Sequence, residues 1–223
     1  MTEAIALLLA GDGETWAIIG RSISFSFFAT LFSLFPGIPL GILLAWRPSR
    51  GRRLAASLVH AISALPTVVI GLFAYSFLSR SGPLGGLGFL YAPAGVVIGQ
   101  FFLATPLVVS VTYAGLSRLD GRFFETMETF SASMPYRLFR TVLEARTAIL
   151  SAIVLAFGRV IGEVGVSMML GGNIKGSTRT MTTAIALDAA KGEFQRALSL
   201  GFMLFLIAIL VNIAVNGLGS HER

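Results

Sequence analysis

Five stretches of the sequence are long and apolar enough to cross a lipid bilayer, and they constrain the fold more than any other feature. They cover residues 18–46, 54–77, 93–116, 148–170 and 198–218. Crossing about 30 Å of hydrocarbon at 1.5 Å per residue takes about 20 mostly apolar residues in a helix. Because hydrocarbon offers no hydrogen-bond partners to an open strand, each stretch must be helical. The sequence therefore predicts an all-α polytopic membrane protein with five spans.

The composition agrees with a membrane protein and excludes several classes of soluble protein. Charged residues make up 13% of the chain and hydrophobic residues 55%, with a mean hydropathy of +0.81, whereas a typical soluble domain has about 25% charged residues. No polar stretch is long enough for a second domain, so residues 1–223 are predicted to form one transmembrane domain surrounded by lipid. The absence of cysteine excludes disulfides, zinc fingers and thiol nucleophiles.

The distribution of basic residues predicts the direction of the spans. If the link at 47–53 is cytoplasmic, ten basic residues lie inside, in that link, in segment 117–147 and in the C-terminal tail, and six lie outside. Cytoplasmic loops carry the excess of lysine and arginine, most clearly in short loops. We therefore predict an N-terminus outside and a C-terminus inside. The net charge of +6 is interpreted as this orientation signal and not as a nucleic-acid-binding surface.

Prolines and small residues indicate bent, closely packed helices. Prolines occur inside three spans, at positions 36, 39, 66 and 106, where each removes a backbone hydrogen bond and kinks the helix. Small residues recur at four-residue spacing at Gly37, Gly41 and Ala45, at Gly95 and Gly99, and at Gly158 and Gly162. Such faces let helix backbones approach closely in lipid. An odd number of spans in a small chain suggests that a transport pathway, if one exists, is made by two copies.

Segment 119–147, between the third and fourth predicted spans, is too polar to cross the membrane. The apolar residues of its first half fall on one helical face, at Phe123, Met127, Phe130 and Met134. A break at 131–133 precedes Pro135, which suits the first turn of a second helix. The segment is therefore predicted to form two short helices joined by a tight turn. It is either an amphipathic linker lying on the membrane or a docking site for a soluble partner.

The same segment resembles the cytoplasmic motif found in permease subunits of binding-protein-dependent ABC importers. That motif has the form E-A-A, three residues, G, nine residues, I-x-L-P. In this sequence Glu125 takes the first place, Ser131 the place of the glycine and Leu143 the place of the leucine. The spacing is kept, although Thr126 and Met127 replace the two alanines.

Three further blocks resemble molybdate and tungstate permeases in particular. They are L-P-T-V-V-I-G-L at 65–72, F-G-R-V-I-G-E-V-G at 157–165 and G-N-I-K-G-S-T-R-T at 172–180. The likeness extends over roughly residues 18–218. Within this group, the stretch 71–85 looks more like the tungstate branch than the molybdate branch.

This resemblance implies a transmembrane subunit that translocates an oxyanion, most closely tungstate, with molybdate or sulfate as alternatives. It implies a homodimer in the cytoplasmic membrane of a prokaryote, bound inside to two ATP-hydrolysing subunits and outside to an oxyanion-binding protein. No catalytic residue and no cofactor are expected on this chain, because ATP is used by the partner subunit. The resemblance also implies that the turn between the short helices docks into the ATPase through Phe130, Ser131, Ala132, Ser133 and Met134.

Two charged residues, Arg159 and Glu163, lie four positions apart in the otherwise apolar fourth span. A charge at the bilayer centre costs about 2.5–3.5 kcal/mol on insertion scales, so intramembrane charges mark functional candidates. The spacing places both side chains on one face of a helix. The pair is predicted to be a gate in the transport pathway, and an ion pair that only fixes helix packing is the alternative.

A polar segment follows the fourth span on the predicted outer side. Its donors suit a doubly charged tetrahedral oxyanion and are predicted to line an oxyanion path, at Asn173, Lys175, Thr178, Arg179 and Thr180. A solvated loop is the alternative. Residues 182–190 are apolar but too short to span, so they are predicted to be re-entrant. Residues 171–178 resemble a phosphate-binding loop with Ser177 in place of its lysine, so ATP binding is not expected.

Two other classes of function are weighed against transport. A membrane enzyme is disfavoured, because the chain has neither a G-x-S-x-G elbow nor paired intramembrane carboxylates. If the chain is a scaffold subunit or a small channel, segment 119–147 is not expected to matter for function. His60 and His221 are the only histidines, so no metal cluster is expected.

Overall fold

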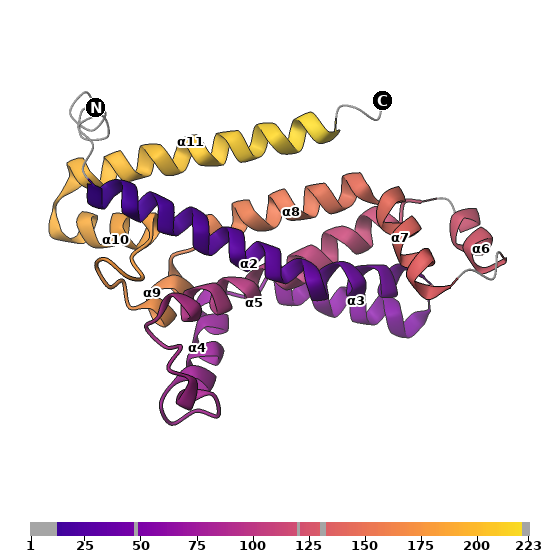
Figure 1. Ribbon diagram of the computed structural model, residues 1–223, viewed down its shortest axis with the longest axis horizontal. Coiled ribbons are helices and arrows are strands. Elements are labelled where there is room, and N and C mark those ends of the chain that lie inside the picture. Colours follow the sequence, from indigo (N-terminus) through magenta and orange to yellow (C-terminus); the bar gives the residue numbers. More distant parts are fainter. Residues whose placement is uncertain (1–12, 47–48, 120, 130–132, 220–223) are drawn as a thin grey trace.

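In the computed structural model, the chain is a bundle of helices with its long helices running along one axis (Figure 1). The structure describes residues 13–46, 49–119, 121–129 and 133–219, and these residues contain helices and no strand. The helices are α2 (Gly13–Trp46), α3 (Arg50–Ser63), α4 (Thr67–Leu78), the 3-10 helix η1 (Gly85–Leu87), α5 (Pro93–Leu116), α6 (Gly121–Thr129), α7 (Met134–Glu144), α8 (Arg146–Ile161), α9 (Gly165–Gly171), α10 (Met181–Lys191) and α11 (Phe194–Gly219). The predicted all-α fold class is confirmed.

Three helices are long and apolar enough to cross a membrane on their own. They are α2, α5 and the part of α11 from Phe194 to Ile213. Two bent pairs, α3 with α4 and α7 with α8, have the required length and hydropathy only when each pair is taken together. The described residues therefore provide three membrane-spanning helices, or up to five if each bent pair is one span.

The second predicted span, 54–77, is not one helix. It divides into α3 and α4, which meet at an angle of 94°. Pro66 lies at the break, and proline disfavours a helical conformation in the residue before it. Figure 1 shows α4 projecting sideways from the bundle. The other three prolines predicted inside spans, at positions 36, 39 and 106, lie inside continuous helices, so of the four only Pro66 lies at a break.

The fourth predicted span, 148–170, is also divided. Helix α8 ends at Ile161, and the seven-residue helix α9 begins at Gly165. Residues 182–190, predicted to be re-entrant, belong to the 11-residue helix α10, which is about 16 Å long and too short to span. In Figure 1, α9 and α10 lie at the same end of the bundle as the start of α2.

Three buried apolar clusters form the core along the length of the bundle. The central one joins α4, α5, α8 and α9 around Ala104, Ala152 and Val166. A second, at the end that carries α10, contains Ile18 and Leu200. The third, at the opposite end, contains Ile42, Leu116 and Ile149, and Leu138 and Val142 of α7 pack against it. The two short helices predicted in segment 119–147 are therefore present as α6 and α7, and α7 is packed onto the bundle.

The tight contact between α2 and α5 depends on two glycines. A Cβ atom at Gly37 would lie 2.6 Å from Val108 Cγ1, and one at Gly41 would lie 2.7 Å from Thr112 Cβ. These distances are shorter than van der Waals contact, so only glycine permits the approach. The predicted small-residue packing is confirmed here. By contrast, a Cβ at Gly162 would meet only a carbonyl of its own segment, at 3.9 Å, so that glycine brings no other helix close.

Leucine at position 41 is expected to lower the free energy of unfolding by about 1–3 kcal/mol, because overpacking forces α2 and α5 apart. Gly20→Leu is the matched control, since Gly20 lies in the same helix and a Cβ atom added there would have no other atom within 4 Å. Denaturant unfolding in detergent, followed through the fluorescence of Trp16 and Trp46, measures both variants. Equal stability of the two would contradict the close α2–α5 packing.

Candidate functional site

The two charges of the fourth predicted span form an ion pair. Arg159 Nη1 donates to Glu163 Oε2 at 2.9 Å. The Glu163 side chain is 4% exposed, whereas that of Arg159 is 41% exposed. The carboxylate is thus held inside the bundle while the guanidinium reaches its surface. The predicted pairing is confirmed, and its role as a gate stays a prediction.

Glu163 lies in the break between α8 and α9, and its backbone N–H donates to the Val160 carbonyl of α8 at 3.1 Å. Its Oε1 accepts a hydrogen bond from the Val166 N–H at 3.2 Å, in the first turn of α9. Its backbone carbonyl accepts one from Thr182 Oγ1, in α10, at 2.8 Å. Interrupted helices are tolerated in a membrane only where neighbouring groups satisfy the freed backbone. Glu163 therefore joins α8, α9 and α10 at a single point.

Gln100 is a third polar residue at this break, and the sequence patterns did not single it out. Its side chain is buried, and Nε2 lies 3.3 Å from the Val160 carbonyl and 3.4 Å from Ser167 Oγ. Val160 is in the last turn of α8 and Ser167 is in α9, so one amide from α5 bridges the interruption. The signal in the sequence was a single amide in the apolar run 93–116.

The predicted oxyanion-path residues at 173–180 form a loop with many internal hydrogen bonds. Thr178 is fully buried, and its Oγ1 donates to the Gly171 carbonyl and accepts from the Ile174 N–H at 3.0 Å. Thr180 caps α10, where it exchanges side-chain to backbone hydrogen bonds with Thr183. Both hydroxyls therefore have partners within the protein.

Asn173 and Arg179 are connected to each other in the same loop. Arg179 Nε donates to Asn173 Oδ1 at 3.2 Å, and Asn173 Nδ2 donates to the Thr183 carbonyl at 3.3 Å. Asn173 has a φ of +51°, a left-handed conformation that asparagine tolerates better than most residues. These contacts give the loop one defined shape.

Glu14, in the first turn of α2, forms ion pairs with three basic residues at this end of the bundle. Its carboxylate lies 2.9 Å from Lys175 Nζ, 3.6 Å from Arg179 Nη1 and 3.5 Å from Arg196 Nη2. The sequence patterns did not single out Glu14, because no local spacing links it to residues so distant in the chain. Of the predicted path residues, Lys175 is the most exposed. Oxyanion contact by this set stays a prediction.

Valine at position 178 is expected to lower the free energy of unfolding by about 2–4 kcal/mol, because two backbone groups lose their partner at about 1–3 kcal/mol each. Thr178→Ser keeps the hydroxyl and loses one methyl group, so it is expected to cost about 1 kcal/mol. Denaturant unfolding in detergent compares the two. If valine is as stable as threonine, the hydroxyl does not hold the loop together.

Helix α7, which begins at the predicted docking residue Met134, lies at the opposite end of the bundle from this loop (Figure 1). Phe130, Ser131 and Ala132 are outside the described residues. Ser133 and Met134, at the start of α7, are exposed, as are Glu125 and Leu143. Further apolar side chains on α7 are exposed as well, at Tyr136 and Phe139.

The fold closely matches a solved transporter. Over 96% of this chain and 99% of the other, it superposes on a chain of the MetNI methionine ABC transporter in an inward-facing conformation, with a TM-score of 0.74. The sequences are 15% identical, so this likeness shows the fold alone.

Two curated relatives are similar in sequence. The tungstate uptake system permease protein TupB of Campylobacter jejuni is 39% identical over 168 residues, which cover 75% of this chain and 70% of that protein. The protein of the same name from Peptoclostridium acidaminophilum is 34% identical over 216 residues, which cover 96% of this chain and 94% of that protein. The family of binding-protein-dependent transport system inner membrane components matches residues 37–221. The chain therefore belongs to this family of membrane transport components, as its sequence motifs had indicated.

Proposed function

We propose that the chain is the permease subunit of an importer that carries tungstate across the cytoplasmic membrane, driven by ATP hydrolysis in a separate subunit. The assignment of tungstate as the substrate rests on the sequence identity of 39% and 34% to two permeases named for tungstate uptake. The stretch 71–85, which resembles the tungstate branch, supports the same substrate. Molybdate and sulfate, which have the same tetrahedral shape and charge, are the alternatives.

The proposed orientation has the N-terminus outside and the C-terminus inside. The end of α5, helices α6 and α7, and the starts of α3 and α8 lie at one end of the bundle, and the start of α2 lies at the other (Figure 1). Eight described arginines belong to the first end: Arg50, Arg52, Arg53, Arg118, Arg122, Arg137, Arg140 and Arg146. An excess of basic residues favours the cytoplasmic side.

Segment 119–147 is proposed to receive two ATP-binding subunits, one on each copy of the chain. One face of α7 packs on the bundle through Leu138 and Val142, while Met134, at the start of the helix, and Phe139 are exposed. Trp46, at the end of α2, contacts Phe124 of α6, with ring centroids 5.5 Å apart. A partner that binds the exposed side chains is therefore connected to α2 and α8 by direct packing, which can transmit a movement.

A homodimer is proposed as the form that encloses a pathway. Helix α4 projects from the bundle and exposes apolar side chains of large volume, among them Val68, Leu72, Phe73 and Phe77. Extended apolar faces of this kind pack against a partner or against lipid. A second copy on the α4 side would cover this face, and an extracytoplasmic oxyanion-binding protein is proposed to deliver the substrate at the end that carries α10.

The test uses the complete transporter in proteoliposomes, with both ATP-binding subunits and the binding protein. Tungsten taken up per transporter is measured by mass spectrometry, and ATP hydrolysis is measured in parallel. Tungstate is expected to stimulate both, with molybdate and sulfate clearly weaker at equal concentration. If only molybdate or sulfate stimulates uptake and ATP hydrolysis, that anion and not tungstate is the substrate. Uptake without ATP would refute ATP-driven import. Calorimetry of the binding protein with the three oxyanions provides an independent ranking.

A further inference from the structure

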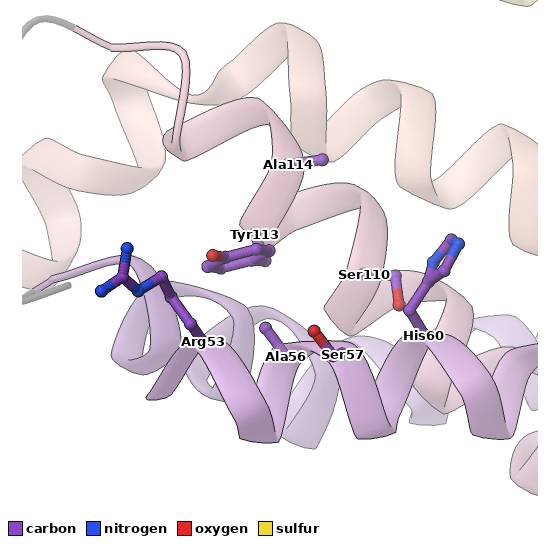
Figure 2. Close-up of a pocket in the computed structure, with 7 residues that line it drawn as sticks. All are labelled: Arg53, Ala56, Ser57, His60, Ser110, Tyr113 and Ala114. Atoms are coloured by element: carbon purple, nitrogen blue, oxygen red, sulfur yellow. The ribbon is translucent and has the colours of Figure 1, made fainter. Parts of the chain in front are cut away.

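A cavity of about 460 Å³ lies between α3 and α5. Figure 2 shows that Arg53 and His60, both from α3, lie at the two ends of the cavity, and that Ser57 lies between them. Helix α5 contributes Ser110 and Tyr113 from the opposite side. The lining residues of each helix recur at spacings of three and four, so each helix presents one face to the cavity.

The polar groups of this cavity are mainly hydrogen-bond donors. Arg53 carries a permanent positive charge with five N–H groups, His60 has at least one ring N–H, and Ser57, Ser110 and Tyr113 each supply a hydroxyl. The cavity lining contains no carboxylate. An anion with several acceptor oxygens is the ligand that such a set binds best.

The donors of the cavity are not used within the protein. Ser110 Oγ is buried and has no hydrogen-bond partner. In the part of the chain that the structure describes, no side-chain hydrogen bond or ion pair engages Arg53, Ser57, His60 or Tyr113. The buried Ser110 hydroxyl and the exposed donors around it are therefore available to an acceptor that enters the cavity.

The position of the cavity in the membrane restricts what can face it. Beside the polar face of α3, the helix exposes an apolar stripe at Leu54, Leu58 and Ile62. An apolar stripe suits lipid or a partner helix, whereas arginine and histidine in a membrane face water or protein. The cavity extends about 10 Å along α3 from Arg53 to His60. It therefore runs along α3 from Arg53, near the arginine-rich end of the bundle, to His60.

We infer that this cavity is an oxyanion site on the cytoplasmic half of the translocation route, where a tetrahedral dianion such as tungstate is held by Arg53, His60 and the three hydroxyls before release. The inference rests on the proposed function and adds a binding site for the substrate on this chain. Since one water molecule takes about 30 Å³ in the liquid, the cavity accommodates the anion with part of its hydration shell.

The exposure of the lining indicates weak binding. Arg53, Ser57 and His60 are at least partly exposed, so solvent screens their interaction with an anion. Weak binding suits a transport route, because an ion that binds too tightly cannot leave. The phosphate group of a lipid has the same chemistry and is the competing occupant, since basic residues near the cytoplasmic face attract anionic lipids.

The experiment measures tungstate binding to the transporter in nanodiscs, with its ATP-binding subunits and without the binding protein. Equilibrium dialysis with mass spectrometry of tungsten gives the Kd. Arg53→Gln and Tyr113→Phe are each expected to raise the Kd about tenfold, because each removes donors to a charged group. Arg50→Gln is the matched control, since it makes the same charge change on α3 outside the cavity, and it is expected to leave the Kd within about twofold.

The outcomes separate the possible occupants. Saturable binding that depends on Arg53 and not on Arg50 supports the site. A Kd that is the same in Arg53→Gln and wild type overturns it, as does the absence of saturable binding. Phospholipid that stays bound through detergent exchange only when Arg53 is present, without tungstate binding, assigns the cavity to lipid and also overturns it. If the wild type imports tungstate in proteoliposomes while these results are negative, only the cavity assignment fails.

Discussion

Aspartate in place of Met134 is expected to abolish coupling to the ATP-binding subunits, with at least a tenfold loss of substrate-stimulated ATP hydrolysis. Met134 is the first residue of α7 and is 59% exposed. An apolar anchor at the centre of a protein interface commonly contributes about 2 kcal/mol or more, which is about a thirtyfold change in affinity. A carboxylate there would have to be desolvated against the partner, so co-purification of the ATP-binding subunits is expected to fall as well.

Phe194→Asp is the matched control for co-purification of the ATP-binding subunits. Phe194 is the first residue of α11, is 64% exposed and lies at the opposite end of the bundle. Aspartate in the first turn of a helix is favourable in both positions, so neither variant is expected to lose its helix. Normal co-purification and stimulated hydrolysis with Met134→Asp would refute the docking assignment and favour a linker that lies on the membrane.

Alanine at position 163 is expected to reduce transport at least tenfold and to lower the free energy of unfolding by about 2–3 kcal/mol. The change removes the acceptor of the Val166 N–H and leaves Arg159 without its partner. Removing one member of a buried pair costs about 3–5 kcal/mol, but Arg159 is 41% exposed, so solvent reduces this cost. Thermal unfolding in detergent and uptake in proteoliposomes measure the two effects separately.

Neutral variants distinguish a gate from a packing contact. Glu163→Gln keeps an oxygen for the Val166 N–H and loses the charge, so its stability is expected to fall by about 1–2 kcal/mol. In the double variant Arg159→Gln with Glu163→Gln, no charge is left unpaired, and most of the stability is expected to return. If the pair gates the pathway, transport stays at least tenfold low in the double variant. Recovery of transport together with stability would assign the pair to helix packing.

The helices were predictable to very different degrees. Helix α5 covers residues 93–116, the bounds that its apolar run predicted. Hydropathy also identified the second and fourth apolar stretches, but their helices are interrupted at Ala64–Pro66 and at Gly162–Val164. The direction taken by α4 after its break depends on packing with α5 and α9, which no local pattern of residues contains.

The contacts in the candidate sites also differ in whether local sequence could predict them. The four-residue spacing indicated that Arg159 and Glu163 are neighbours, and they form an ion pair, although Glu163 lies in the break after α8 and not on the continuous helix that was predicted. The contacts of Glu14 with Lys175 and Arg179 join segments far apart in the sequence, and so does the bridge from Gln100 to α8 and α9. Such contacts are set by the way the helices pack, and a single sequence carries no record of that packing.

The sequence by itself determined the class of fold, the apolar segments, the two short helices at 119–147 and the family. It could do so because hydropathy, helical periodicity and motif spacing are local properties of the chain. Only the tertiary structure decided where α3 and α8 end, how the loop at 172–180 is held, and that α3 and α5 bring Arg53, His60 and three hydroxyls around one cavity. These features arise where helices pack against one another. That packing depends on the fit between side chains of different helices, as the close α2–α5 contact at Gly37 and Gly41 shows.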